Sequence, residues 1–249
     1  VAERIKLWPF LVFTLILTAL IYPFQASWKW GGGFLDALGF LDFAGSSVVH
    51  SVGGYAALAG AIVLGARHGK YKADGSVSPM PGANLPLATL GTFILWLGWF
   101  GFNGGSQLAM GSFDDVNSVA RIFMNTNLAA AAGVVVAAGL TRVVYGKTDV
   151  VQMLNGALGG LVAITAEPLM PSPIIAIIVG GIGGAIVVFG SQLLIRMQID
   201  DVVGAIPVHM FAGIWGTLAV VISNTEVSLG AQVIGCLLYT SPSPRDKRL

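Results

Sequence analysis

Long apolar segments, separated by short polar stretches, limit what this chain can fold into. A helix needs roughly 20 apolar residues to cross the hydrocarbon core of a bilayer. Segments of about this kind cover residues 7–27, 46–66, 85–106, 127–146, 151–166, 173–195 and 203–223, and a further one begins near residue 228. Only 10% of the residues are charged and 55% are hydrophobic, whereas a soluble domain carries about 25% charged residues. The sequence therefore predicts an all-α, polytopic transmembrane helical bundle, with about seven spans and the start of an eighth.

The 34 glycines suit such a bundle, because small residues let the backbones of neighbouring transmembrane helices approach closely. Two glycine clusters, within residues 156–160 and 180–184, lack the strand and the Lys-Ser/Thr signature of a phosphate-binding loop. We interpret them as packing surfaces. The single cysteine, Cys236, excludes an internal disulfide and a metal site built on cysteines. No motif indicates a cofactor, and we expect none.

Basic residues between the apolar segments indicate the orientation of the chain. With the N-terminus in the cytoplasm, the inside segments carry most of the lysine and arginine, as the positive-inside rule requires. The inside set is Arg4, Lys6, Arg67, Lys70, Lys72, Arg142, Lys147 and Arg196, and the outside set is Lys29 and Arg121. An outside loop with Asp114 and Asp115 agrees with this assignment. We therefore expect a multi-pass protein of the cell (plasma or inner) membrane, with residue 1 on the cytoplasmic side.

One nine-residue pattern occurs twice. DFAGSSVVH (42–50) and DVVGAIPVH (201–209) share D-x-x-G-x-x-x-V-H, and each opens an apolar segment. Gly54 and Gly213 continue the match at the same spacing. In the predicted orientation the first element runs from outside to inside and the second from inside to outside. Many transporters build a site near the bilayer midplane from such inverted repeats, so we predict an inverted repeat here.

His50 and His209 each lie about two turns into an apolar segment, where a polar ring is costly unless it faces a polar group or a cavity. If the repeats meet at their axis, the two imidazoles face each other, one nitrogen donating and the other accepting. Such a neutral pair would disfavour a dehydrated cation, admit a small neutral molecule, and could relay a proton because imidazole titrates near neutral pH. The alternative is that each histidine bonds a backbone carbonyl and only ties helices together.

Other polar residues have simpler interpretations. Two histidines without a nearby cysteine make a poor ligand set, so a metal site is disfavoured. His68, in the basic loop RHGKYK, is expected at the surface. Asp42, Asp200 and Asp201 precede helices, where carboxylates cap free N–H groups. Asp42 would also lie at the outer mouth, where it could draw cations while holding backbone around a site without touching the ligand.

Two aromatic clusters fall on the predicted outer side, one around Trp28 and Trp30 and one in LGWFGFNGGSQL (97–108). An ammonium-like cation binds over aromatic faces, best over tryptophan, with roughly 1–2 kcal/mol when partly desolvated. Trp30, Phe102 and Ser106 would supply aromatic faces and a hydroxyl acceptor at one level of the membrane. The alternative is an interfacial aromatic belt.

These residues resemble those of the ammonium transporter family (Amt/Mep/Rh), through DFAGSSVVH (42–50), GWFGFNGGS (98–106), AITAEPLMPSP (163–173) and DDVVGAIPVHMFAGIWG (200–216). The resemblance covers about residues 2 to 235. It implies a homotrimer of eleven-helix protomers, each with a pore between inverted five-helix halves. It also implies that ammonium binds outside, loses a proton near a gate and passes the pore as ammonia. An electrogenic proton relay along the histidines is favoured for the Amt/Mep branch.

The same resemblance assigns roles to individual residues. Trp30 and Ser106 would form the external ammonium site, with Phe102 as one of two stacked gate rings. Asp42 would be the structural carboxylate beneath that site, and His50 and His209 the pore pair. Because Rh-type channels lack this Trp/Ser cation site, the Amt/Mep branch is favoured over a neutral ammonia channel of the Rh type.

Alternatives from other classes stay open. An ammonium-sensing membrane domain of a signalling protein would carry the same residues, whereas an enzyme is disfavoured because no nucleophile or metal set accompanies the His/Asp pairs. As partners we expect ammonium or ammonia, the lipid bilayer and a cytoplasmic PII-type regulator, but no nucleic acid.

Against the family pattern the chain departs at both ends. Residues 1–235 are interpreted as a fragment of the transmembrane domain that lacks the first three helices and one gate phenylalanine. CLLYTSPSPRD (236–246) resembles an in-frame translation of a sequencing adapter. We therefore interpret residues 236–249 as an artefact of a metagenomic fragment, and Cys236, Arg245, Lys247 and Arg248 are given no functional role.

Overall fold

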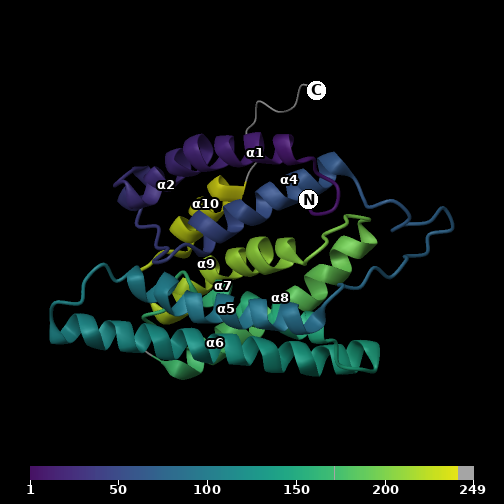
Figure 1. Ribbon diagram of the computed structural model, residues 1–249. Coiled ribbons are helices and arrows are strands. Elements are labelled where there is room, and N and C mark those ends of the chain that lie inside the picture. The colour runs from purple at the N-terminus through teal and green to yellow at the C-terminus, as the bar shows by residue number, and fades with distance from the viewer. Residues whose placement is uncertain (171, 241–249) are drawn as a thin grey trace.

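The computed structural model describes residues 1–170 and 172–240 of the chain (Figure 1). Its helices are α1 (Leu7–Ile16), η1 (Leu17–Ile21), α2 (Tyr22–Trp30), α3 (Phe34–Ala37), η2 (Ser46–Ser51), α4 (Val52–Leu64), α5 (Leu85–Gly105), α6 (Phe113–Tyr145), α7 (Val150–Ile164), α8 (Pro173–Arg196), η3 (Ile206–Phe211), α9 (Ala212–Ser223) and α10 (Leu229–Thr240). The elements labelled η are single turns of π-helix. Within the described ranges there is no strand, only an isolated bridge between Tyr71 and Val77. The predicted all-α class is confirmed.

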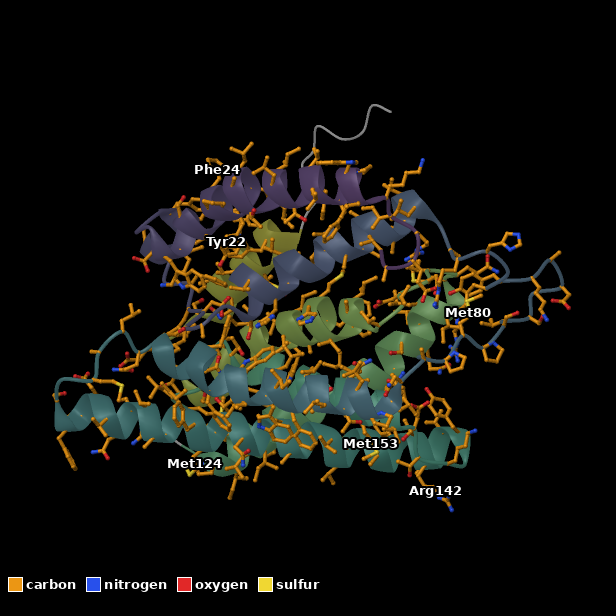
Figure 2. All side chains as sticks on the ribbon, viewed as in Figure 1. Tyr22, Phe24, Met80, Met124, Arg142 and Met153 are labelled. Carbon is orange, nitrogen blue, oxygen red and sulfur yellow. The ribbon has the colours of Figure 1, made fainter. Side chains whose placement is uncertain are left out.

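Six segments are long and apolar enough to cross a bilayer by length and composition. They are Leu7–Ala37, Ser46–Leu64, Leu85–Gly105, Phe113–Tyr145, Pro173–Arg196 and Ile206–Ser223. Helices α7 and α10 are apolar but shorter, with 15 and 12 residues. Many large apolar side chains face outward, such as Phe24 on α2 and Met124 on α6, which lie on opposite edges of the bundle (Figure 2). The chain is a multi-pass helical membrane protein.

The prediction for the fourth span was wrong at its start, because α6 begins at Phe113 and not at residue 127. Ser112 caps the helix in a reciprocal capping box with Asp115. Asp114, Asp115 and Arg121, assigned to an outside loop, therefore lie in the helix itself. With 33 residues and about 1.5 Å rise per residue, α6 exceeds a hydrocarbon core of roughly 30 Å. Hydropathy alone did not predict this part of the helix, because its first turns are polar.

Helices α6, α7 and α8 pack with their backbones in contact at glycines. A Cβ atom placed on Gly133 of α6 would lie 2.1 Å from the carbonyl oxygen of Gly156 on α7. One placed on Gly159 would lie 2.9 Å from the carbonyl oxygen of Gly183 on α8. Since no side chain fits at these points, the glycine clusters are helix-packing surfaces, as predicted.

The two repeat elements cross in opposite directions. Along η2 and α4, Ser47 contacts Thr217, His50 contacts His209, and further on Arg67 contacts Asp200. The order on the second element is therefore the reverse of the order on the first. Figure 1 shows α4 and α9 in the middle of the bundle, with α1 along one edge and α6 along the other. The two elements pack through α4 on η3 and η2 on α9. The predicted antiparallel pairing of the two elements is confirmed.

Close packing at glycine continues at this crossing. A Cβ atom on Gly54 would lie 2.4 Å from the backbone nitrogen of Met210. One on Gly213 would lie 2.4 Å from the carbonyl oxygen of Ser46 and 2.6 Å from the Oγ of Ser51. Each glycine thus contacts the residue that follows the histidine of the other repeat, as a two-fold axis between the elements requires.

Some interpretations concern residues near the chain end. Helix α10 continues through Cys236 to Thr240, and Tyr239 is buried against Phe40 and Trp28. Residues 241–249, with Arg245, Lys247 and Arg248, lie outside the described residues, as does Pro171 of the motif at 163–173.

Candidate functional site

A buried carboxylate holds the turn that precedes η2. Asp42 is fully buried, and its Oδ1 accepts the backbone N–H groups of Gly45 at 3.0 Å and Ser46 at 2.7 Å. Its Oδ2 accepts those of Ser47 at 2.8 Å and Val48 at 2.9 Å. Four N–H donors on one carboxylate satisfy the free backbone groups at the start of the helix. The expectation that Asp42 acts by holding backbone agrees with this geometry.

The same turn occurs before η3. Asp201 accepts the N–H groups of Gly204 at 3.0 Å, Ala205 at 3.0 Å and Ile206 at 2.7 Å. Gly204 has a φ of 78° and Gly45, at the equivalent point of the first repeat, has 110°. Both lie in the left-handed region that favours glycine. The shared D-x-x-G of the two motifs is therefore one capping turn, built twice.

Asp200 does not cap the helix, and its predicted role was wrong. Its carboxylate instead accepts the backbone N–H of Arg67 at 2.9 Å and the guanidinium of Arg67 at 2.8 and 3.0 Å, while Arg4 donates to its carbonyl at 2.9 Å. Burial would raise the pKa of the Asp200 carboxyl, but the hydrogen bonds and charge of Arg67, helped by Arg4, hold the pKa below its ordinary value. Asp200 thus ties the end of α4 to the start of the second repeat.

His50 and His209 meet at the crossing of the two repeats. Their Nδ1 atoms are 3.1 Å apart, and the rings lie nearly parallel with centroids 5.2 Å apart. One Nδ1 must donate and the other accept, so the contact fits a pair of neutral rings in complementary tautomers. The prediction that the two imidazoles face each other is confirmed as geometry. The Nε2 of His50 is buried and has no hydrogen-bond partner among the described residues.

An aromatic wall on α5 supports this pair. Trp99 stacks on His50 with centroids 4.9 Å apart and an interplanar angle of 14°, and Phe102 lies 5.4 Å from the same ring. The indole Nε1 of Trp99 donates to the Oγ1 of Thr165 at 2.9 Å, which fixes the ring in its plane. Sequence reasoning did not single out Trp99 or Thr165. The spacing of Trp99 and Phe102, which puts them on one helix face, was the available signal.

Trp30 contacts the Asp42 turn, whereas Phe102 and Ser106 lie at the end of α5. The indole Nε1 of Trp30 donates to the carbonyl of Asp42 at 3.0 Å, and the ring lies against Gly45 of the Asp42 turn, with 44% of the residue exposed. Ser106 ends α5 and donates its hydroxyl to the carbonyl of Phe102 at 2.9 Å. Among the described residues no ring contact joins Trp30 to Phe102. The contacts of Trp30 are thus with the Asp42 turn, and those of Phe102 are with the histidine pair.

Other polar residues lie outside the contacts described above. His68 is exposed in the loop after α4, as predicted. No group of three or more histidine, cysteine, aspartate or glutamate side chains that could hold a metal ion occurs in the part of the chain that the structure describes. A buried glutamine on α10, Gln232, contacts the segment before Asp42 and was missed by sequence reasoning, because nothing in its sequence neighbourhood marks it.

This architecture defines a class: a polytopic helical membrane protein built on an inverted repeat, with paired histidines where the repeats cross. The chain belongs to the Ammonium Transporter Family, whose family profile matches residues 1–243. The sequence resemblance to this family is thereby confirmed.

Individual relatives are also named as ammonium transporters. Ammonium transporter Amt2 of Archaeoglobus fulgidus is 48% identical over 229 residues, which are 88% of this chain and 48% of that protein. The ammonium transporter of Bacillus subtilis is 41% identical over 219 residues, 88% of this chain and 51% of that protein. The chain thus spans about half the length of the curated relatives that it matches.

Solved structures share the fold. A structure titled "Sensor Amt Protein" superposes with a TM-score of 0.91 at 39% identity, over 97% of this chain and 63% of that one. Mep2 of Candida albicans superposes with a TM-score of 0.83 at 32% identity, over 96% of this chain and 56% of that one.

Proposed function

We propose that the complete protein transports ammonium across the cell membrane, as its relatives are named to do. In this proposal the cation binds at an outer aromatic site, is deprotonated near Phe102, and passes the histidine pair as ammonia. The observation that carries the proposal is the contact between His50 and His209, 3.1 Å apart on oppositely directed helices. A chain that only needed to tie helices together could bond each ring to a nearby carbonyl, without bringing two rings together.

The outer site would combine a ring face with a negative field. Trp30 exposes part of its ring beside the Asp42 turn, and Asp42 forms no ion pair with a lysine or arginine among the described residues. A cation above the indole gains roughly 1–2 kcal/mol when partly desolvated, and the buried carboxylate adds an attraction that water screens weakly. Ser106 would accept an N–H bond and Phe102 would close the site from below.

The histidine pair would select for the neutral molecule. Ammonia has a lone pair and N–H groups, so it can both accept from and donate to a neutral imidazole. A dehydrated cation at the same point would meet two uncharged rings and an aromatic wall, without a counter-charge to replace its lost water. Because the two Nδ1 atoms share one hydrogen bond, the pair could also pass on the proton that ammonium leaves behind, which would make transport electrogenic.

Membrane placement and assembly are part of the proposal. Arg4 and Arg67, which the positive-inside rule assigns to the same side, both contact Asp200, and this supports a common side for them. We take this side as cytoplasmic, in the plasma or inner membrane, with residue 1 inside. A homotrimer and a cytoplasmic regulator of the PII type are proposed from the family resemblance.

The proposal is tested by expressing the complete gene product in cells that lack ammonium uptake. Growth on low ammonium, and uptake that saturates with ammonium concentration, are expected. Replacing Trp30 by leucine should raise the ammonium concentration for half-maximal uptake by about ten-fold, the equivalent of roughly 1.4 kcal/mol of cation binding. Lack of growth and of uptake, with the protein present in the membrane, would contradict transport.

A second candidate is an ammonium sensor, favoured by the close superposition on the structure titled as a sensor. Transport and sensing use the same outer site and differ in whether the molecule crosses. Saturable ammonium binding to the purified complete protein, with no ammonium flux in liposomes that contain it, would favour the sensor.

A further inference from the structure

Gln232, on α10, is fully buried and uses its whole amide. Its Oε1 accepts the backbone N–H of Leu41 at 2.8 Å, and its Nε2 donates to the carbonyl of Leu41 at 2.8 Å. The same Nε2 donates to the carbonyl of Thr217 on α9, also at 2.8 Å. One side chain therefore fixes both backbone groups of Leu41 and joins three parts of the chain.

The residue that Gln232 fixes is next to the outer site. Leu41 precedes Asp42, and the carbonyl of Asp42 accepts the indole N–H of Trp30. The N–H and the carbonyl of Leu41 belong to the two peptide units that flank its Cα, so rotation of either unit breaks one hydrogen bond to Gln232. The peptide that carries the Asp42 carbonyl is held by the N–H of Phe43 on the carbonyl of Ala166 at 2.8 Å. Gln232 anchors the adjoining peptide, so the segment that leads into the Asp42 turn, and the Trp30 contact on it, has an anchor on each side.

The second repeat holds the equivalent point differently. At the 159-residue spacing of the two histidines, Leu41 corresponds to Asp200, which is held by the guanidinium of Arg67. That clamp is an ion pair, whereas the clamp at Leu41 is a neutral amide. A cationic clamp beside Asp42 would compete with ammonium for the field of the carboxylate, and a glutamine supplies the hydrogen bonds without positive charge.

We propose that Gln232 is a positioning residue for the outer cation site: it anchors the segment that leads into the Asp42 turn, to which Trp30 is bonded, and its neutrality leaves the carboxylate free to attract the cation. This inference rests on the proposed function. It predicts that loss of the clamp weakens the binding of ammonium at the site, because the segment before Asp42 loses one of its two anchors, while the histidine pair stays in place.

The test replaces Gln232 by methionine, which has similar length and no hydrogen-bonding amide, in the complete protein. The concentration of ammonium for half-maximal uptake should rise about five-fold, the loss expected for about one well-made hydrogen bond. The maximal rate per folded protein should change less than two-fold. Gln192→Met is the matched control, because Gln192 on α8 bonds Tyr145 on α6 and not the Asp42 segment, and it should leave both values unchanged.

A merely structural role would lower the amount of folded protein and the maximal uptake, with the half-saturation concentration unchanged, and this result would overturn the proposal. Gln232→Asn stays polar but is one methylene shorter, so it cannot span Leu41 and Thr217 together. If the methionine variant does not fold, Gln232→Asn takes its place in the test, and it should also raise the half-saturation concentration. Absence of both variants from the membrane would assign Gln232 to folding and overturn the proposal as well.

Trp30→Leu, measured beside these variants, separates this inference from the function on which it rests. If Trp30→Leu raises the half-saturation concentration and neither Gln232 variant does, the positioning role alone is wrong. If none of the three changes it, the outer cation site itself is wrong.

Discussion

Gly54 packs against the backbone of Met210, the residue that follows His209, and at the same spacing Gly213 packs against Ser51, the residue that follows His50. The two contacts are equivalent under the pseudo-two-fold axis of the inverted repeat. They set how closely the two helices cross and, through the neighbouring residues, how closely the two imidazoles approach.

Alanine at Gly54 or Gly213 should therefore push the crossing apart. The added methyl group meets backbone atoms that cannot move away, which typically costs about 1–3 kcal/mol, and ammonium uptake should fall with the separation of the rings. Gly53→Ala is the matched control, since nothing lies within 4 Å of a Cβ atom at Gly53. Thermal unfolding and uptake of the three variants check the prediction, and equal behaviour of Gly53→Ala and Gly54→Ala would contradict it.

Asp42→Asn should disrupt the turn before η2, because the amide NH₂ would face N–H donors where the carboxylate oxygen accepts two of them. A buried donor left unsatisfied costs about 1–3 kcal/mol, and uptake should fall at least about ten-fold. Asp201→Asn changes the equivalent turn, which is only partly buried, so its effect on stability should be smaller. A larger loss of stability for Asp201→Asn would argue against this ranking.

Thr165→Val tests the support of the histidine pair. It removes the acceptor of the buried Trp99 indole at nearly constant volume, and should lower the free energy of unfolding by about 1–3 kcal/mol. Thr92→Val is the control, since Thr92 bonds the carbonyl one turn before it in α5, and its effect should stay below about 1 kcal/mol. Uptake by the Thr165 variant should fall if Trp99 orients His50.

The Asp200–Arg67 ion pair should make stability depend on pH in one direction. The folded-state pKa of Asp200 is depressed, so its contribution is present above the unfolded value of about 3.9 and is lost as pH falls through the lower folded-state value. Unfolding midpoints measured from pH 7 to pH 3 should fall more steeply for the parent than for Asp200→Asn. Asp36→Asn removes an exposed ion pair with Lys29 and should shift stability by less than about 1 kcal/mol.

Features that repeat or follow a simple period could be read from the sequence. The apolar segments, the glycine packing surfaces and the two D-x7-H elements each follow from local composition or spacing, and the meeting of His50 and His209 follows from the symmetry of the repeat. The start of α6 at Phe113 could not be read in this way, because a helix that extends beyond the hydrocarbon has polar turns that resemble a loop.

Contacts made by single side chains across the bundle could not be predicted from the sequence either. Asp200 looks like a helix cap beside Asp201, and only the fold brings Arg67 to it. Gln232 lies in an apolar helix without a recognisable motif, and its partner Leu41 is 191 residues away in the sequence. Such long-range pairs leave no periodic trace in one sequence.

The most direct test of the account is the current carried by the complete protein when both His50 and His209 are replaced by leucine. Ammonium-induced and potassium-induced currents would be measured in the same membranes, with the amount of folded protein matched. The account predicts that the ammonium current disappears or that discrimination against potassium is lost, because the pair is the point at which only a neutral molecule passes. An unchanged ammonium current with unchanged discrimination would contradict it.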